Sequence, residues 1–254
     1  MSSKRATKPK PKVQTPCDRC PLRGLDTFRD FTPEELAFML EFKSGELVLD
    51  AGTSILHEGS NSPHLYTVLS GWAYKYKTLP DGRRQVLNYA LPGDFIGLQA
   101  SIFDVSSHSV EALTDVVLCV FPRERLWDLF ARHTGLAFDV TWLGAHEENI
   151  LGDFLVSVGK RSATERVAFV LLQLFARARQ AGLVKNGALG FPVTQELLAD
   201  TVGFSLVHTN KTLKRLRRSK AFTWQGPTLE VASEDKLAEL ASTSPPGAGR
   251  RPLI

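Results

Sequence analysis

The sequence has no apolar run long enough to span a bilayer, and its N-terminus lacks the hydrophobic region of a secretory signal peptide. We therefore expect a cytoplasmic protein without a membrane partner. Three cysteines in 254 residues are too few for a disulfide framework. The chain also lacks a glycine-rich phosphate loop, a nucleophile elbow and a paired carboxylate site. An enzyme is therefore only a remote alternative.

Net charge is also low, at +4, so basic residues carry information only where they are concentrated. One concentration lies at residues 1–14, where we expect either a solubilising tail or a weak contact with DNA or a membrane surface. Its five basic residues are Lys4, Arg5, Lys8, Lys10 and Lys12. The other concentration lies near the C-terminus and is more specific.

Residues 194–221 predict a helix-turn-helix. Thr194 is a good N-cap for a first short helix, Gly203 suits a tight turn, and small Ala199 allows a second helix to pack closely. The second helix is followed closely by further basic residues. Between residues 205 and 221 the basic residues are Lys211, Lys214, Arg215, Arg217, Arg218 and Lys220, with no acidic residue. A basic helix can be an ordinary solvated face, but the turn glycine favours DNA binding.

The segments after this basic helix agree with that interpretation. Residues 221–224 and 228–231, separated by a turn at 225–227, predict a small hairpin that would serve as a β-wing on the phosphate backbone. Ser233 is expected to cap a last short helix. The Pro/Gly-rich residues 246–254 predict a flexible tail.

The first half of the chain is rich in β signals. Short apolar or alternating runs lie between turn residues at 46–50, 65–69, 72–77, 84–91 and 117–121. Pro80-Asp81-Gly82 is a strong hairpin signal between two of these runs. Strands this short and this closely spaced predict an antiparallel roll or barrel.

A long helical pattern at residues 131–160 connects the two parts. Apolar residues at alternating steps of three and four predict a seam that two such helices would bury in a homodimer. The seam residues are Leu136, Val140, Leu143, Ile150 and Phe154. The alternative is a core helix packed on its own domain. Ser162 and Glu165 form a capping box that starts the next helix.

This order of elements resembles the CRP/FNR family of bacterial transcription regulators. The resemblance rests on residues 52–59, 65–71, 91–97 and 203–205 with the basic helix that follows, and it covers nearly the whole chain. It implies an α+β fold with a cyclic-nucleotide-binding-type β-roll, a long dimerisation helix and a C-terminal winged helix-turn-helix. The expected segments are a flexible N-terminal segment 1–27, a sensor domain 28–130, a dimerisation helix 131–160, a DNA-binding domain 161–245 and the tail 246–254.

The resemblance also suggests which residues read DNA. Family members read base edges from the second helix, and here Asn210 could pair with adenine and Lys211 with guanine. Basic residues further along would contact phosphates. The candidate DNA-binding residues are Ser205, Val207, His208, Asn210, Lys211, Lys214 and Arg215. The implied partners are near-palindromic double-stranded DNA, RNA polymerase and a second copy of the chain.

For the signal that the sensor domain detects, a cyclic nucleotide is not expected. Nucleotide-binding family members hold the ribose with a glutamate and the phosphate with an Arg-Ser pair. The corresponding positions here are Leu98 and His108-Ser109. Without the arginine fork, a buried phosphate loses its bidentate partner.

The cysteines suggest a different signal. In the oxygen-sensing FNR branch a [4Fe–4S] cluster is held by three N-terminal cysteines and one in the roll. Cys17, Cys20 and Cys119 match three of these positions, and Asp26 stands at the remaining one. A carboxylate is a harder donor than a thiolate and would hold iron less firmly. The resemblance therefore implies a [4Fe–4S] cluster that senses oxygen, redox state or nitric oxide and releases DNA when it is destroyed.

Other interpretations of the cysteines stay open. Cys17-x-x-Cys20 is also compatible with a disulfide or with chance, and Cys119 with an ordinary buried cysteine. Structural zinc would need a fourth donor such as His57 or His64. If the cysteines are incidental, the roll would instead bind a small organic effector.

Overall fold

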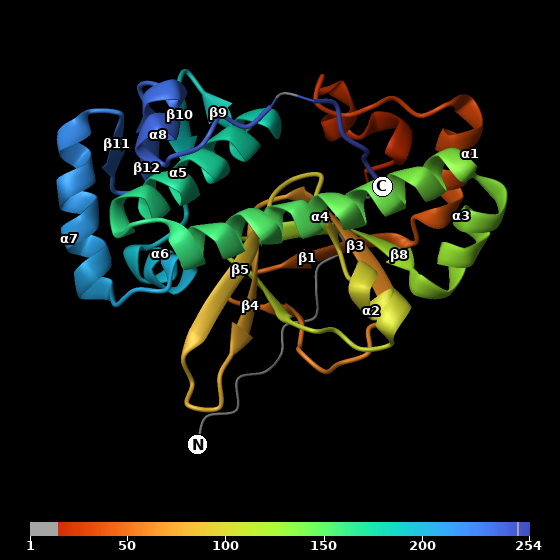
Figure 1. The fold of residues 1–254 in the computed structure, drawn as a ribbon. Coiled ribbons are helices and arrows are strands. Elements are labelled where there is room, and N and C mark those ends of the chain that lie inside the picture. Colours follow the sequence, from red (N-terminus) through yellow and green to blue (C-terminus); the bar gives the residue numbers. More distant parts are fainter. Residues whose placement is uncertain (1–14, 248) are drawn as a thin grey trace.

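A β-roll, a long helix and a C-terminal winged helix-turn-helix follow one another along the chain, as Figure 1 shows. The computed structural model describes residues 15–247 and 249–254. The basic segment 1–14 therefore lies outside the described residues, and so does most of the predicted flexible segment 1–27. Its remaining part, which contains Cys17 and Cys20, is folded onto the roll.

The predicted antiparallel roll is confirmed. Its strands form two sheets in the orders β1-β8-β3-β6 and β2-β7-β4-β5, with every pairing antiparallel. The strands are β1 Gly45–Leu49, β2 Ser54–Leu56, β3 His64–Ser70, β4 Ala73–Thr78, β5 Arg84–Ala90, β6 Phe95–Ile96, β7 Ser109–Ala112 and β8 Val116–Pro122.

Short helices surround the roll and lead into the long one. The sequence analysis did not predict α1, although Thr32 and Glu35 form a complete capping box at its start. The bounds are η1 Cys17–Arg19, η2 Pro21–Gly24, α1 Pro33–Phe42, α2 Leu98–Phe103, η3 Arg123–Arg125, α3 Leu126–Arg132 and α4 Thr134–Lys160.

The C-terminal domain contains the predicted helix-turn-helix and wing. The wing hairpin is extended by the strands β9 and β10, giving a sheet in the order β11-β12-β10-β9. The elements are α5 Ala163–Gln180, β9 Val184–Lys185, β10 Ala188–Gly190, α6 Gln195–Val202, α7 Leu206–Leu216, η4 Arg217–Ser219, β11 Phe222–Gln225, β12 Thr228–Val231 and α8 Glu234–Leu240.

The roll and the C-terminal domain share one hydrophobic core. Trp72, Tyr74 and Tyr89 of the roll belong to the same buried cluster as α5 and α6. The contact is also polar, because the hydroxyls of Tyr89 and Thr201 lie 2.7 Å apart. Burying apolar surface together with satisfied polar groups fixes the orientation of the two domains in this structure.

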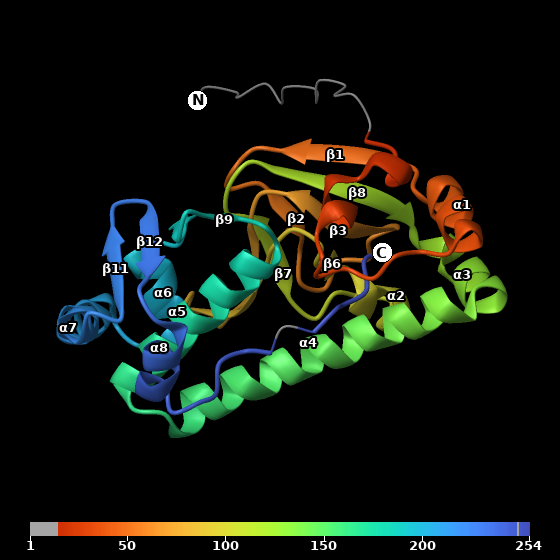
Figure 2. The ribbon, with the colours of Figure 1, turned by 90° about the horizontal axis from the view of Figure 1, so that it is seen from above.

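The chain after α8 departs from the sequence expectation. The residues predicted as a flexible tail return to the roll and run beside α4 (Figure 2). Leu253 and Ile254 are 5% and 4% exposed, and Arg251 forms a parallel β-bridge with Phe28. The prediction of a frayed tail is therefore wrong for residues 249–254, because their partners lie far away in the sequence.

Across the described parts of the chain, no helix combines the length and the apolar character that crossing a membrane would need.

Candidate DNA-binding and sensor sites

Caps at both ends of the turn define the helix-turn-helix. The Thr194 hydroxyl accepts a hydrogen bond from the Leu197 amide at 3.1 Å and so starts α6. Gly203 ends that helix in the left-handed region at φ 72°, which glycine adopts without steric cost. The Ser205 hydroxyl then accepts from the His208 amide at 3.3 Å and starts α7.

Arg166 on α5 contacts this turn and stabilises it. Its Nη1 donates to the Val202 carbonyl at 2.8 Å, and its guanidinium lies 4.5 Å from the centroid of the Phe204 ring. A carbonyl at the end of α6 is thereby satisfied, and the angle between the two short helices depends on a long-range contact as well as on the turn.

One side of α7 is buried and the other is exposed. Thr209 and Thr212 are buried, and the Thr212 hydroxyl donates to the His208 carbonyl at 3.0 Å. All the candidate DNA-binding residues are exposed: Ser205, Val207, His208, Asn210, Lys211, Lys214 and Arg215. Among these residues, the His208 ring packs on the Phe204 ring with 4.7 Å between the ring centroids, and Arg215 donates a hydrogen bond to the Thr164 hydroxyl.

The predicted dimer seam on α4 does not face outward. Leu136, Val140, Leu143 and Phe154 are all buried within their own chain, and Ile150 packs against the shared core. These residues are therefore not free to meet a second chain, and the prediction that they form the dimer interface is wrong. The alternative interpretation, a helix packed on its own domain, describes this face.

A second stripe on α4 is exposed along its whole length. Its residues also recur at alternating steps of three and four: Phe138, Thr141, Ala145, Glu148, Gly152, Leu155 and Gly159. Phe138 and Leu155 are 68% and 74% exposed, and most of the others are small, which permits a close approach of two helices. The exposed residues of α4 thus repeat with the period of the predicted seam, but on a different face of the helix.

A cavity of about 230 Å³ lies between the roll, α4 and α5. Its charged lining includes Lys75, Glu147 and Arg177, and its apolar lining includes Leu98 and Ile150. Lys75 Nζ lies 2.9 Å from Glu147 Oε2. Burial alone would raise the pKa of Glu147, but Lys75, Asn88 and Arg177 together lower it.

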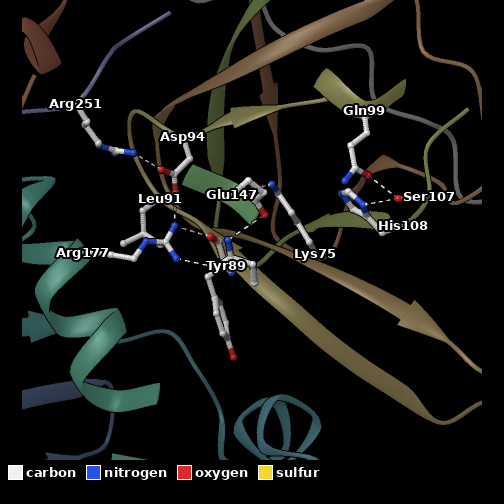
Figure 3. Close-up of polar contacts among 11 residues, drawn as sticks. Lys75, Tyr89, Leu91, Asp94, Gln99, Ser107, His108, Glu147, Arg177 and Arg251 are labelled. Atoms are coloured by element: carbon white, nitrogen blue, oxygen red, sulfur yellow. Dashed lines mark hydrogen bonds and ion pairs between the residues drawn. The ribbon is translucent and has the colours of Figure 1, made fainter. Parts of the chain in front are cut away.

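Asp94 closes one end of this cavity. Its carboxylate pairs with Arg177 Nη2 on α5 at 2.7 Å and with Arg251 Nη1 of the C-terminal segment at 2.6 Å. Figure 3 shows the two guanidiniums reaching the carboxylate from different segments. Burial alone would raise the pKa of Asp94, but Arg177 and Arg251 hold it well below its usual range. The sequence analysis missed this group, although Asp94 lies within one of the motifs that carry the resemblance.

The three cysteines share a second, much smaller cavity. Cys17, Cys20 and Cys119 line a space of about 30 Å³ together with Leu253 and Ile254. Burial raises the pKa of Cys17 and raises that of Cys119 to about 11. Cys17 Sγ lies 3.6 Å from the Met39 carbonyl. The sequence analysis grouped these cysteines correctly.

Comparisons with known proteins agree with this architecture. Residues 46–133 match the family model for the cyclic nucleotide-binding domain, and residues 165–240 match the Crp-like helix-turn-helix domain. The nitrogen fixation regulation protein FixK of Bradyrhizobium diazoefficiens is 31% identical over 216 residues, which cover 81% of this chain and 85% of that protein. The chain belongs to the CRP/FNR family. It is therefore a DNA-binding transcription regulator and not an enzyme.

Further similar proteins support this family assignment. The transcriptional activator FnrL of Cereibacter sphaeroides is 27% identical over 221 residues, covering 85% of this chain and 87% of that protein. The solved structure of FixK2 from Bradyrhizobium japonicum has a TM-score of 0.69 at 25% identity, covering 77% of this chain and 96% of that one. These similarities extend across both domains.

The cavity of this CRP/FNR regulator is poorly suited to a cyclic nucleotide. Leu98 and His108, which stand at the ribose and phosphate positions, both line it. Burial, with the nearby Lys75 ammonium as the second cause, lowers the pKa of His108 to about 4. A neutral imidazole offers a phosphate no charge at pH 7, and Lys75 beside it already pairs with Glu147.

The described residues also do not fit the [4Fe–4S] cluster of the FNR branch. The space between the three cysteines is about the volume of one water molecule. Within residues 15–247 and 249–254, no three Cys, His, Asp or Glu side chains are placed to hold a metal ion. Asp26 is exposed and does not line this cavity, so its prediction as the fourth ligand is wrong. Leu22 of η2 is buried, and the turn that follows η2 leaves Asp26 at the surface.

We predict that His108 makes stability depend on pH. The pKa of the unfolded imidazole is near its ordinary value of 6.5, whereas the pKa of folded His108 is about 4. Protons are then taken up on unfolding, so the stability contributed by His108 is present above pH 6.5 and is lost as pH falls toward 4. When the pH falls from 7 to 5, the free energy of unfolding should decrease by about 1–2 kcal/mol less in His108→Gln than in the native protein. Urea unfolding at the two pH values measures this difference.

The matched control is His57→Gln, which removes an exposed imidazole from the same roll. It should follow the pH dependence of the native protein. An equal loss of stability in His108→Gln and the native protein would contradict the buried neutral state of His108.

Proposed function

We propose that this regulator binds a near-palindromic DNA site as a homodimer in the cytoplasm, with α7 of each chain in the major groove, and that it acts on transcription through RNA polymerase. The observation that carries this proposal is the exposed side of α7. Asn210 and Lys211 lie there as base-reading candidates, and Lys214 as a phosphate contact. Arg166 and the two caps fix the orientation of this side, which is what groove recognition requires.

Asn210→Ala should weaken binding to the selected site by about 1–3 kcal/mol and relax specificity at one base pair, because the bidentate amide is lost. Lys214→Ala should weaken binding to every DNA sequence nearly equally. It should also reduce the number of counterions released on binding, and hence the salt dependence of the affinity, by about one. Both effects are measurable by fluorescence anisotropy over a salt series, on a duplex that the protein itself selects from a random-sequence pool.

Lys236→Ala is the control, since this exposed lysine lies on α8 and away from α7. Its affinity should equal that of the native protein. Unchanged specificity in Asn210→Ala would remove α7 as the base-reading helix.

The same proposal places the dimer contact on the exposed stripe of α4. Two stripes packed together would bury Phe138 and Leu155 and bring the small residues into close contact. Ala145→Lys should weaken dimerisation by about tenfold or more, because it buries two like charges at the seam. Sedimentation equilibrium over a concentration series measures this change.

Asp153→Lys places the same side chain at an exposed position of α4 outside the stripe, and it should leave the dimer intact. If both variants dimerise as the native protein does, the stripe is not the interface.

For the signal, we propose a small organic effector bound in the cavity between the roll, α4 and α5. What supports this is the lining, since Lys75, Glu147 and Arg177 come from three different elements. A ligand there would contact the roll, the helix with the exposed stripe and the DNA-binding domain together. It would therefore act directly on the arrangement that DNA binding needs.

The alternative signal is the iron–sulfur cluster implied by the FNR branch. Its support is the convergence of Cys17, Cys20 and Cys119 on one cavity, and it would require Leu253 and Ile254 to leave that cavity.

Iron and acid-labile sulfide analysis of anaerobically purified protein distinguishes the two signals. We expect no stoichiometric iron or sulfide, no visible absorption band, and DNA binding that persists in air. Stoichiometric iron and sulfide, with a visible band bleached by air, would overturn the effector proposal in favour of the cluster.

A further inference from the structure

Residues 249–254, hereafter the strap, connect the DNA-binding domain back to the sensor domain. The chain leaves α8, passes Gln180, whose Nε2 donates to the Gly247 carbonyl at 3.0 Å, and reaches the N-terminal turns of the roll. Figures 1 and 2 both show this return alongside α4. The strap is therefore a second connection between the domains, in addition to α4.

The first half of the strap is fixed by Arg251. Its amide donates to the Thr27 carbonyl at 2.7 Å, and its own carbonyl accepts from the Arg29 amide at 2.9 Å. Its guanidinium lies 4.8 Å from the centroid of the Phe28 ring and pairs with Asp94 at 2.6 Å. Since Asp94 also pairs with Arg177 of α5, one buried carboxylate binds both the strap and the DNA-binding domain.

The second half of the strap closes the cysteine cavity. Leu253 and Ile254 line that cavity beside Cys17, Cys20 and Cys119. The Thr67 hydroxyl on β3 donates to the Ile254 carbonyl. Cys119 is 8% exposed. The cavity is therefore closed by residues that follow the DNA-binding domain in the sequence.

We propose that the strap is a latch that couples the accessibility of the cysteine cavity to the DNA affinity of the protein. With the strap docked, Asp94 holds α5 against the roll, and the DNA-reading side of α7 remains exposed. In this arrangement the DNA-binding domain is already held relative to the roll, so DNA binding costs less conformational entropy. Release of the strap opens the cysteines to reagents and leaves Asp94 with Arg177 as its remaining arginine partner, so the DNA-binding domain is held less firmly and affinity falls.

The coupling must be reciprocal. If the docked strap favours DNA binding, bound DNA must favour the docked strap by the same factor. DNA that contacts only α7 and the wing should therefore protect cysteines in the sensor domain. This relationship depends on DNA binding, which the family assignment establishes, and on neither of the two candidate signals.

Thiol labelling tests the latch on the intact protein. N-ethylmaleimide is added under anaerobic conditions, and mass spectrometry follows the label at each cysteine. In Arg251→Gln and in the double variant Leu253→Ser/Ile254→Ser, Cys119 should react about tenfold faster or more, because reactivity follows the open population. The affinity of the same variants for the selected duplex should fall about fivefold or more.

Arg250→Gln is the matched control, because it removes a neighbouring guanidinium of the strap whose side chain is 59% exposed. It should change neither quantity by more than about twofold, as expected for an exposed ion pair. Circular dichroism and the oligomeric state show whether each variant has folded.

A second experiment needs no variant. Saturating the native protein with the selected duplex should slow the labelling of Cys119 severalfold, whereas an unselected duplex of equal length should slow it less. Native labelling rates in the strap variants would overturn the latch, and so would faster labelling without any loss of DNA affinity. Failure of the selected duplex to protect Cys119 would overturn the coupling even where the variants do not fold.

Discussion

One largely buried carboxylate, Asp94, joins the roll, the DNA-binding domain and the strap. Asp94 lies just before β6 at the edge of the roll and receives two guanidiniums, one from α5 and one from the strap. A buried carboxylate without partners would cost several kcal/mol, so its position strongly favours having both arginines in place. The Leu91 amide, which donates to Oδ2 at 2.7 Å, fixes the carboxylate itself. Roll, DNA-binding domain and strap therefore meet at one charge that none of them can bury alone.

This charge also lies at the edge of the effector cavity. Arg177 and Arg251 line the cavity as well as binding Asp94. A molecule that entered with an anionic group would compete with Asp94 for the same donors, and a cationic one would compete for the carboxylate. In either case a change in the cavity alters the attachment of the DNA-binding domain without a long chain of intermediates. The Arg84–Asp200 ion pair and the Tyr89–Thr201 contact hold the domain to the roll at a second place.

Local signals in the sequence were sufficient for most of the fold. Thr194 and Gly203 predicted the helix-turn-helix because an N-cap and a left-handed glycine act within a few residues. The alternation of residues 72–77 likewise predicted β4. The strap could not be found in this way, because nothing near Arg251 in the sequence indicates that Asp94 is its partner. The proline and glycine content of residues 246–254 predicted a flexible tail, but the ion pair between Arg251 and the distant Asp94 fixes the strap to the roll.

The dimer seam shows a different limit. Periodicity identifies a stripe but does not say what the stripe faces. On α4 the more hydrophobic stripe, with Leu136, Val140 and Leu143, packs on its own roll. The smaller residues form the exposed stripe. The sequence analysis did not select them, because it looked for large apolar side chains, which are the ones most often buried. In the same way, grouping the cysteines by family position was correct, but the volume between them depends on Leu253 and Ile254, which no local motif indicates.

The dimer contact proposed on the exposed stripe of α4 would let one helix serve two chains. Leu143, Gly144 and Glu147 form part of the cavity wall, while Ala145 and Gly152 lie on the exposed stripe a short distance around the same helix. A continuous helix of 27 residues is stiff along its axis. A small rotation that accommodates a ligand on one side must therefore move the stripe on the other. Because the stripe consists largely of small residues, two copies would pack closely and tolerate little rotation without losing contact. The pairing of two chains and the occupancy of the cavity are then linked by the rigidity of α4, while Asp94 and the strap link the same cavity to the DNA-binding domain.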